Sequence, residues 1–112
     1  MRNPIFRKIS EWKDKGQGYM IYGDEAEIIE SNVVTVKKGQ STGVGSHHNE
    51  EEVYVVISGR GRVRVGDVVN EVEAGTVIYI PRNAEHESTG LSDEDYVYLC
   101  VAIYFDKKPD QH

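Results

Sequence analysis

The stretch GSHHNEEEVYVVISG (residues 45–59) places two histidines and three glutamates directly before an apolar run. The run at 53–57 is β-branched or aromatic and is apolar at both odd and even positions, which is typical of a strand covered on both faces. We therefore expect a central core strand here, with the polar residues gathered at its beginning.

Short runs of strand-forming residues recur along the rest of the chain. Turn signals separate them about every eight to twelve residues, and no comparable helical periodicity is present. Gly66 and Asp67 stand between two runs that each have an apolar and a polar face, which predicts a hairpin. The expected fold class is all-β, an antiparallel sandwich or barrel. Strands are expected at 33–36, 53–57, 61–65, 68–72, 76–80 and 96–105, with weaker ones at 19–22 and 26–30.

The length and composition fit one globular domain. The chain has 112 residues, of which 38% are hydrophobic and 29% charged, and we predict a single domain over 1–112. Residues 1–15 are expected to form an N-terminal extension, either mobile or docked on a partner, and 106–112 a flexible tail. Because the core of so small a domain is modest, oligomerisation would help to bury apolar surface.

The charge balance excludes several classes of partner. The formal net charge is −6 and the basic residues do not cluster, so we expect no nucleic-acid partner and no binding to an anionic membrane surface. No apolar run approaches the ~20 residues of a membrane span, and the N-terminal sequence lacks the apolar core of a signal peptide. The single cysteine, Cys100, is expected to be a buried thiol. A cytoplasmic location is the expectation.

The spacing of His48 and Glu52 limits how these residues can act together. A continuous strand would separate them by ~13 Å. If the chain instead reverses at 49–51, they become cross-strand neighbours with Cβ atoms roughly 5 Å apart, a separation that suits one metal ion. A second polar reversal at 81–86 follows another apolar run and ends at His86. Two histidines and one carboxylate are therefore expected to converge at the edge of the barrel.

These residues resemble the two sequence motifs of the cupins, a family of small β-barrels. The first motif reads Gly-x5-His-x-His-x3,4-Glu-x6-Gly. Counted back from Glu52, which stands seven residues before Gly59, its second histidine falls on His48 and its first on Ser46. The second motif reads Gly-x5-Pro-x-Gly-x2-His-x3-Asn. Its positions fall on Gly75, Pro81, Asn83 in place of glycine, His86, and Gly90 in place of asparagine.

The resemblance extends over about 33–105 and implies a small single-domain cupin of the conserved-barrel type, with an antiparallel double-stranded β-helix or jelly-roll fold. It also implies a divalent metal ion inside the barrel, bound by His48, Glu52 and His86. Ser46 offers only a weak hydroxyl ligand where imidazole is expected, so the candidates for a fourth ligand are Ser46 and His47. Strand alternation points His47 away from the face that carries His48, and a bulge would be needed to bring it in.

Two tyrosines are candidates for binding a small molecule. Tyr54 shares strand parity with Glu52, and Tyr98 lies on the last expected strand. Buried tyrosine hydroxyls need hydrogen-bond partners, so the two would suit a wet cavity that holds a small polar ligand. The alternative is that both only pack in the core.

A site of two histidines and one carboxylate leaves open positions on a manganese, iron, nickel, copper or zinc ion. The expected function is binding of a divalent metal and a small carboxylate- or carbonyl-bearing molecule. If the protein is an enzyme, the resemblance implies dioxygenase, decarboxylase or isomerase chemistry, with Glu85 and Tyr54 as weak candidates for an acid or base. The alternatives are a non-catalytic binding or sensor module and a metal-free barrel that binds an anion.

The resemblance also implies a homodimer. Segment 5–12 is the candidate for contact with a neighbouring barrel, with Phe6, Ile9 and Trp12 as its apolar anchors.

Overall fold

The computed structural model describes residues 2–11 and 18–106. Among these residues, no helix is long or apolar enough to cross a membrane. The described elements are the short 3₁₀ helix η1 (Ile9–Glu11) and the strands β1 (Gly18–Ile21), β2 (Ile29–Val36), β3 (Glu50–Ser58), β4 (Arg60–Val65), β5 (Val68–Glu73), β6 (Val77–Ile80), β7 (His86–Gly90) and β8 (Tyr96–Tyr104).

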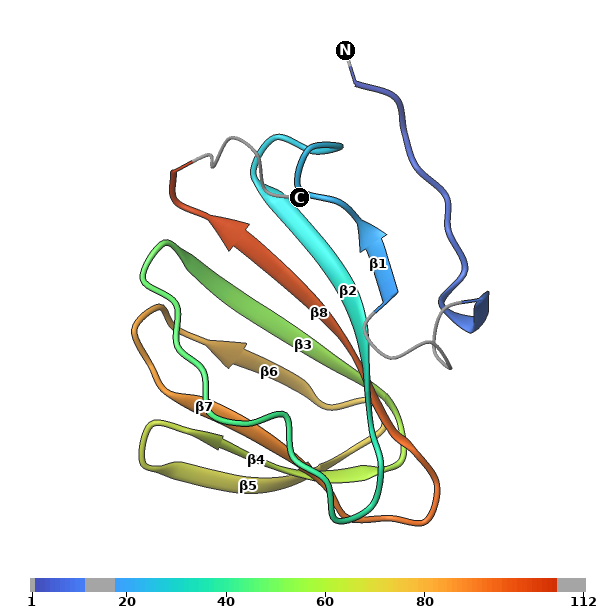
Figure 1. The fold of residues 1–112 in the computed structure, drawn as a ribbon, viewed down its shortest axis with the longest axis vertical. Coiled ribbons are helices and arrows are strands. Elements are labelled where there is room, and N and C mark those ends of the chain that lie inside the picture. Colours follow the sequence, from blue (N-terminus) through green and yellow to red (C-terminus); the bar gives the residue numbers. More distant parts are fainter. Residues whose placement is uncertain (1, 12–17, 107–112) are drawn as a thin grey trace.

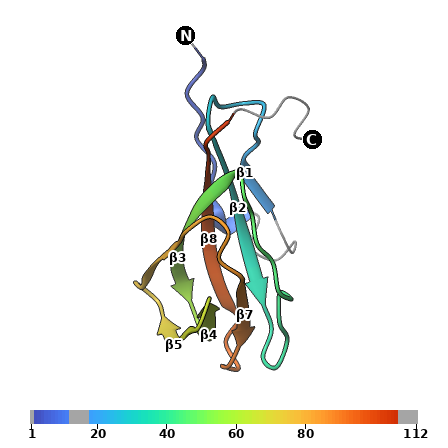
Figure 2. The ribbon, with the colours of Figure 1, turned by 90° about the vertical axis from the view of Figure 1, so that its left-hand side faces the viewer.

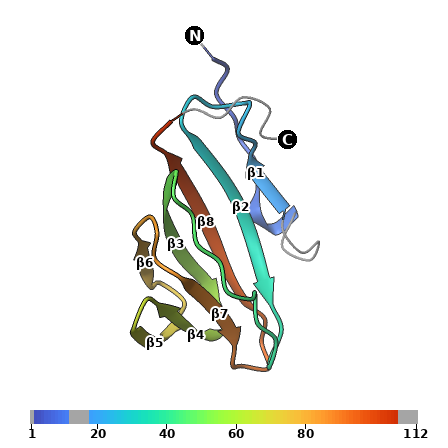
Figure 3. The same ribbon diagram turned by 60° about the vertical axis from the view of Figure 1, so that its left-hand side comes forward.

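The strands form two antiparallel sheets that face each other (Figures 1 and 2). The large sheet has the order β1-β2-β8-β3-β6 and the small sheet the order β5-β4-β7. Figure 3 shows the small sheet set against the lower half of the large one, so that the upper ends of β2 and β8 extend beyond it. The all-β class and the two-sheet architecture expected from the sequence are confirmed.

The hairpin predicted at Gly66 and Asp67 is present. β4 and β5 pair from Val65 opposite Val68 to Arg60 opposite Glu73, and Gly66 has a φ of 57°. This left-handed conformation suits glycine because it has no Cβ to clash with its own backbone. The register turns Val63 toward the core and Arg62 toward solvent, as the alternating sequence indicated.

Two features of the sheets differ from the expectation. First, β3 begins at Glu50, which pairs with Tyr104 of β8, so the chain does not reverse at 49–51. Because Glu50 and Glu51 are charged, their side chains did not indicate that the central strand begins at these residues. Second, His86 opens β7, which pairs with β4, where the sequence indicated only a polar reversal. The β7 sequence His-Glu-Ser-Thr-Gly is too polar to be predicted as a strand from its residues alone. It forms a strand because its backbone pairs with that of β4.

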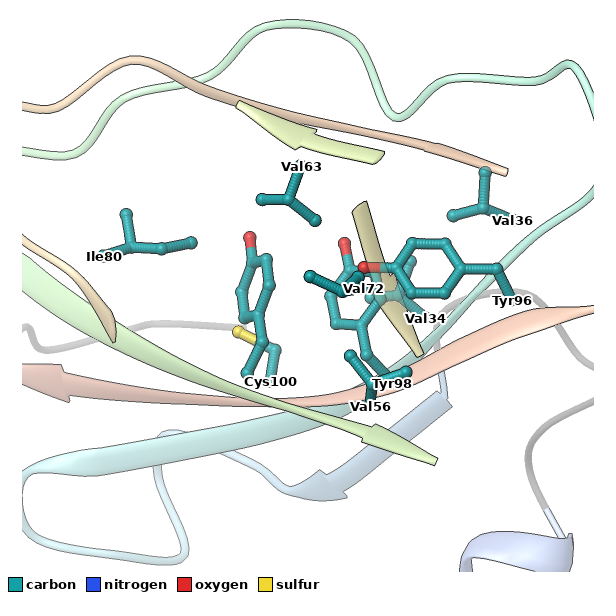
Figure 4. Close-up of a cluster of buried hydrophobic side chains, with 10 residues drawn as sticks. Val34, Val36, Val56, Val63, Val72, Ile80, Tyr96, Tyr98 and Cys100 are labelled. Atoms are coloured by element: carbon teal, nitrogen blue, oxygen red, sulfur yellow. The ribbon is translucent and has the colours of Figure 1, made fainter. Parts of the chain in front are cut away.

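The main core lies between the two sheets (Figure 4). The small sheet contributes Val63 and Val72, which face side chains of the large sheet. Tyr96 is fully buried and lies across Gly61, where an added Cβ would stand 2.6 Å from the tyrosine ring. The remaining buried members of this cluster are Val34, Val36, Tyr54, Val56, Ile80, Tyr98 and Cys100.

The N-terminal arm, residues 2–11, lies along the outer face of the large sheet. Arg7 holds it by two 2.7 Å hydrogen bonds to the carboxylate of Glu25 and a third to the Met20 carbonyl. Ile9 packs against a second cluster that includes Val33 and Val97.

The predicted anchors of the arm have different outcomes. Ile9 packs as described, whereas Phe6 is 93% exposed in the single chain. Trp12 lies outside the described residues, as do residues 107–112 of the predicted tail. Asp106, the last described residue, exchanges two hydrogen bonds with Asn49, which precedes β3.

Candidate metal centre

Three segments carry the site: the loop at 41–49, the beginning of β3 and the beginning of β7. Gly45 and His86 lie opposite each other and exchange two backbone hydrogen bonds of 3.0 and 2.9 Å. The amide of Asn83 donates a third, of 2.7 Å, to the carbonyl of His47. These bonds fix the loop beside β7 and bring its side chains over the inner face of β3.

His47, Glu52 and His86 each offer a ligand atom toward one point, and these atoms lie within 4.8 Å of one another. Glu52 Oε1 is 3.3 Å from His86 Nε2 and 3.9 Å from His47 Nε2. With bonds of ~2.1 Å, ligand atoms around one metal ion are roughly 3 to 3.5 Å apart, so small side-chain movements would suffice to bind a metal here.

The two carboxylate oxygens of Glu52 differ in their surroundings. Oε2 accepts a hydrogen bond from the thiol of Cys100 at 3.0 Å. Oε1 is buried and has no hydrogen-bond partner, although it faces both imidazoles. Burial and the adjacent Glu52 raise the pKa of Cys100 well above that of an ordinary thiol, so the thiol keeps its proton and stays a donor.

The imidazole of His86 is oriented by its own backbone. Its Nδ1 lies 3.1 Å from the carbonyl oxygen of Ala84, which can only accept, so Nδ1 carries the proton and Nε2 presents its lone pair. Nε2 and the carboxylate oxygen of Glu52 then face each other as two acceptors. A cation between them, either a proton or a metal ion, removes this repulsion.

A carboxylate faces the Nδ1 atom of His47, as the Ala84 carbonyl faces that of His86. Nδ1 of His47 is 3.6 Å from Oε1 of Glu50, which is buried, while Nε2 points toward Glu52. Carboxylates and carbonyls that face the second nitrogen of a histidine commonly orient metal-binding imidazoles.

The three groups open onto a cavity of about 270 Å³. Tyr54 and Tyr98 line it with their rings stacked 4.3 Å apart, and the ring of Tyr54 meets His86 edge-on. Burial raises the pKa of both tyrosines, so both keep their protons at neutral pH. None of the residues that the structure places in the wall is lysine or arginine. A larger cavity of about 670 Å³ lies between β5 and β6, away from these groups.

The family follows from the sequence comparison. A family model described as "Cupin domain" matches residues 32–102, which is more than half of the chain. The chain belongs to the cupin family. This confirms the resemblance found in the two motifs.

Relatives of known structure share this fold at low identity. A cupin protein from Bacteroides fragilis has a TM-score of 0.76 at 19% identity and covers 100% of this chain and 93% of its own. A Klebsiella pneumoniae protein with a double-stranded β-helix domain also has a TM-score of 0.76, at 15% identity and 95% coverage of both chains. These likenesses show the fold.

A curated relative is the mannose-1-phosphate guanylyltransferase ManC of Salmonella typhimurium. It is 35% identical to this cupin over 86 residues, which are 75% of this chain but 18% of that protein. The chain thus spans less than a fifth of the length of this relative.

Among the predicted ligands, Glu52 and His86 meet as expected, but the second imidazole belongs to His47. His48 and Ser46 are exposed and stand outside both the group of three and the cavity wall. The alternation argument that turned His47 away does not hold, because residues 46–49 are not a strand. With four residues between His47 and Glu52, the cupin spacing of three or four is still satisfied.

The other predicted residues have clearer outcomes. Tyr54 and Tyr98 line the cavity of the cupin, and their role in binding a ligand stays a prediction. Glu85 lies 3.7 Å from Arg64 in an ion pair and outside the cavity wall. Sequence reasoning missed Asn32, Thr42 and Gly45, all of which line the cavity. Gly45 had a signal, because it stands two residues before His47, where the motif has its first histidine.

Proposed function

We propose that this cupin binds a divalent metal ion through His47, Glu52 and His86 and holds a small carboxylate- or carbonyl-bearing molecule beside it. The observation that carries the proposal is Oε1 of Glu52, a buried carboxylate oxygen that faces two imidazole nitrogens and has no hydrogen-bond partner. Buried ionisable groups are retained where they are paired or bind a metal. Two nitrogens and one oxygen suit manganese, iron, nickel, copper or zinc.

The main alternative is a metal-free barrel in which the histidines bind an anion. An anion placed there would approach the carboxylate of Glu52, and two negative charges at short range in a buried site repel strongly. The wall of the cavity, as far as the structure describes it, provides no lysine or arginine to offset this repulsion. A metal ion offsets this repulsion, because its charge of +2 balances the carboxylate of Glu52 that would bind it.

The residues around the site support binding and orientation. A metal bound here would act as a Lewis acid toward a carbonyl or carboxylate oxygen, or activate dioxygen. Tyr54 and Tyr98 stay protonated and can donate hydrogen bonds to a ligand. Cys100 donates to Glu52 and stays protonated as well. A binding or sensor role is therefore favoured over acid–base catalysis by the chain itself.

The test is the metal content of protein made without a histidine tag and incubated in turn with manganese, iron, nickel, copper or zinc. We expect about one metal ion per chain, because the three side chains form one site. His47→Ala and His86→Ala should each lose the metal. His48→Ala is the matched control and should keep it, because His48 is an exposed neighbour in the same loop.

Two results would contradict the proposal. One is the absence of metal uptake by folded wild-type protein with every ion tried, which would favour the metal-free barrel. The other is loss of metal in His48→Ala with retention in His47→Ala, which would mean that His48, and not His47, binds the metal.

A further inference from the structure

Cys100, a residue of the main core, contacts the carboxylate of Glu52. The register of β3 and β8 pairs Cys100 with Tyr54 and Glu52 with Ala102, so Cys100 and Glu52 are diagonal neighbours on the inner face of the large sheet. Both residues are buried, and the thiol donates a hydrogen bond of 3.0 Å to Oε2 of Glu52. The pairing of the two strands therefore fixes a contact between a core residue and a candidate metal ligand.

This hydrogen bond makes the two oxygens of Glu52 unequal. The distances from the carboxylate to the imidazoles, 3.3 Å to His86 and 3.9 Å to His47, are both measured from Oε1. Oε2 is directed instead at the sulfur of Cys100. If both oxygens were to bind one metal ion, Oε2 would have to turn toward the imidazoles, and the hydrogen bond from the thiol would be lost because it depends on direction.

We propose that Cys100 is a positioning residue that keeps Glu52 a one-oxygen ligand of the metal. This inference rests on the proposed metal site. Carboxylates bind metal ions through either one oxygen or both, so a neighbouring group can decide between the two modes. A thiol is a weak donor, but here its acceptor is a carboxylate and the bond is buried, and both conditions strengthen a hydrogen bond.

The number of oxygens that Glu52 supplies sets how many positions the metal keeps for other molecules. With two imidazoles and one oxygen, a six-coordinate ion such as Mn²⁺ keeps three positions, whereas a second oxygen from Glu52 would leave two. A ligand that binds through two oxygens fills both positions in the second case. In the first case one position stays open beside the ligand, for a water molecule or a second small reactant. Cys100 thus lets two molecules meet at the metal.

Two other roles of Cys100 lead to different expectations. As a core residue alone, it would matter only through its volume, because it belongs to the cluster between the sheets. As a metal ligand, it would bind as a thiolate. However, its sulfur is not among the ligand atoms that lie within 4.8 Å of one another. Substitutions that separate size from hydrogen bonding distinguish the three roles.

The experiment counts the water molecules bound to Mn²⁺ in the loaded protein from the paramagnetic relaxation of water protons. Wild type should hold about three, and Cys100→Ala and Cys100→Val about two, because Glu52 then binds through both oxygens. The relaxation due to bound water should therefore fall by about one third in these two variants. Cys100→Ser is the matched control, because its hydroxyl also donates a hydrogen bond, and it should keep the wild-type count.

Serine resembles alanine in size but cysteine in hydrogen bonding, so the grouping of the variants decides between positioning and packing. Equal counts in all four proteins, a count of two in wild type, or a serine variant that behaves like alanine while valine behaves like wild type would overturn this inference. A sulfur-to-metal charge-transfer band in Co²⁺-loaded wild type would also overturn it, by making Cys100 a ligand. Each of these results leaves the proposed metal site standing.

Failure of wild type to bind Mn²⁺ or any of the other ions would overturn both proposals. If Cys100→Ala does not fold, Cys100→Val, which replaces the lost volume without a donor, still decides.

Discussion

At the scale of single residues, the candidate site depends on the groups that contact each candidate ligand on the side away from the other two. The Cys100 thiol satisfies one oxygen of Glu52 and leaves the other directed at the histidines. The Ala84 carbonyl sets the proton of His86 on Nδ1, and Glu50 stands behind His47. None of these partner residues is a defined position of the two cupin motifs, yet they determine which atoms of the three candidate ligands can bind a metal.

Glu50 offers a test of this arrangement. Glu50→Gln should weaken metal binding by about 10- to 100-fold, because the carboxylate that orients His47 is replaced by a neutral amide. Calorimetric titration with Mn²⁺ measures the effect. Glu51→Gln is the control, since Glu51 lies on the opposite face of the same strand and contacts Tyr79. An unchanged affinity in Glu50→Gln would show that His47 needs no such support.

At the scale of strands and loops, the sequence predicted what local patterns determine. The apolar alternation of β4 and β5 and the glycine at their turn indicated the hairpin, and the run at 53–57 indicated a central strand. Strand β7 was missed because its pairing with β4, rather than its own side chains, makes it a strand. His47 was predicted only as a candidate fourth ligand, because strand alternation turned it away from the site; in the structure the hydrogen bonds between β7 and the loop set its direction.

Gly90 shows how closely the segments of the barrel approach one another. A Cβ on Gly90 would lie 2.4 Å from the carbonyl oxygen of Lys37, which is backbone and cannot turn aside. Gly90→Ala should therefore lower the free energy of unfolding by about 1–3 kcal/mol. Urea unfolding measures this, and Gly45→Ala, whose Cβ would meet only Nε2 of His86 at an ordinary contact distance of 3.8 Å, should change stability by less than about 0.5 kcal/mol. Equal losses in both variants would contradict the steric explanation.

The N-terminal arm should depend on pH through Glu25. The Arg7 guanidinium and the Tyr22 amide lower the pKa of Glu25 from 4.5 to about 2. A lowered pKa in the folded state means that the ion pair stabilises the arm above about pH 4.5 and loses this effect as the pH falls toward 2. Hydrogen exchange of residues 2–11 should thus be faster in Glu25→Gln than in wild type at pH 7. The difference should shrink below pH 4; a constant difference would contradict this role.

At the scale of the whole molecule, the two sheets have different roles. The inner face of the large sheet carries Glu52 and part of the cavity wall, while its outer face along β8, β3 and β6 is apolar. The small sheet closes the core and, through β7, positions His86 and the loop at 41–49.

Because His47, Glu52 and His86 come from three separate segments, a metal bound to all three should stabilise the whole fold. An ion that binds only the folded state at 100 times its dissociation constant adds about 2.7 kcal/mol, since the unfolded chain does not assemble the site. For a domain of this size, that corresponds to a rise in Tm of about 10 °C. Scanning calorimetry with and without Mn²⁺ should show this rise in wild type and in His48→Ala, but not in His47→Ala. A similar rise in His47→Ala would mean that the ion binds without this imidazole, and the site would have to lie elsewhere in the chain.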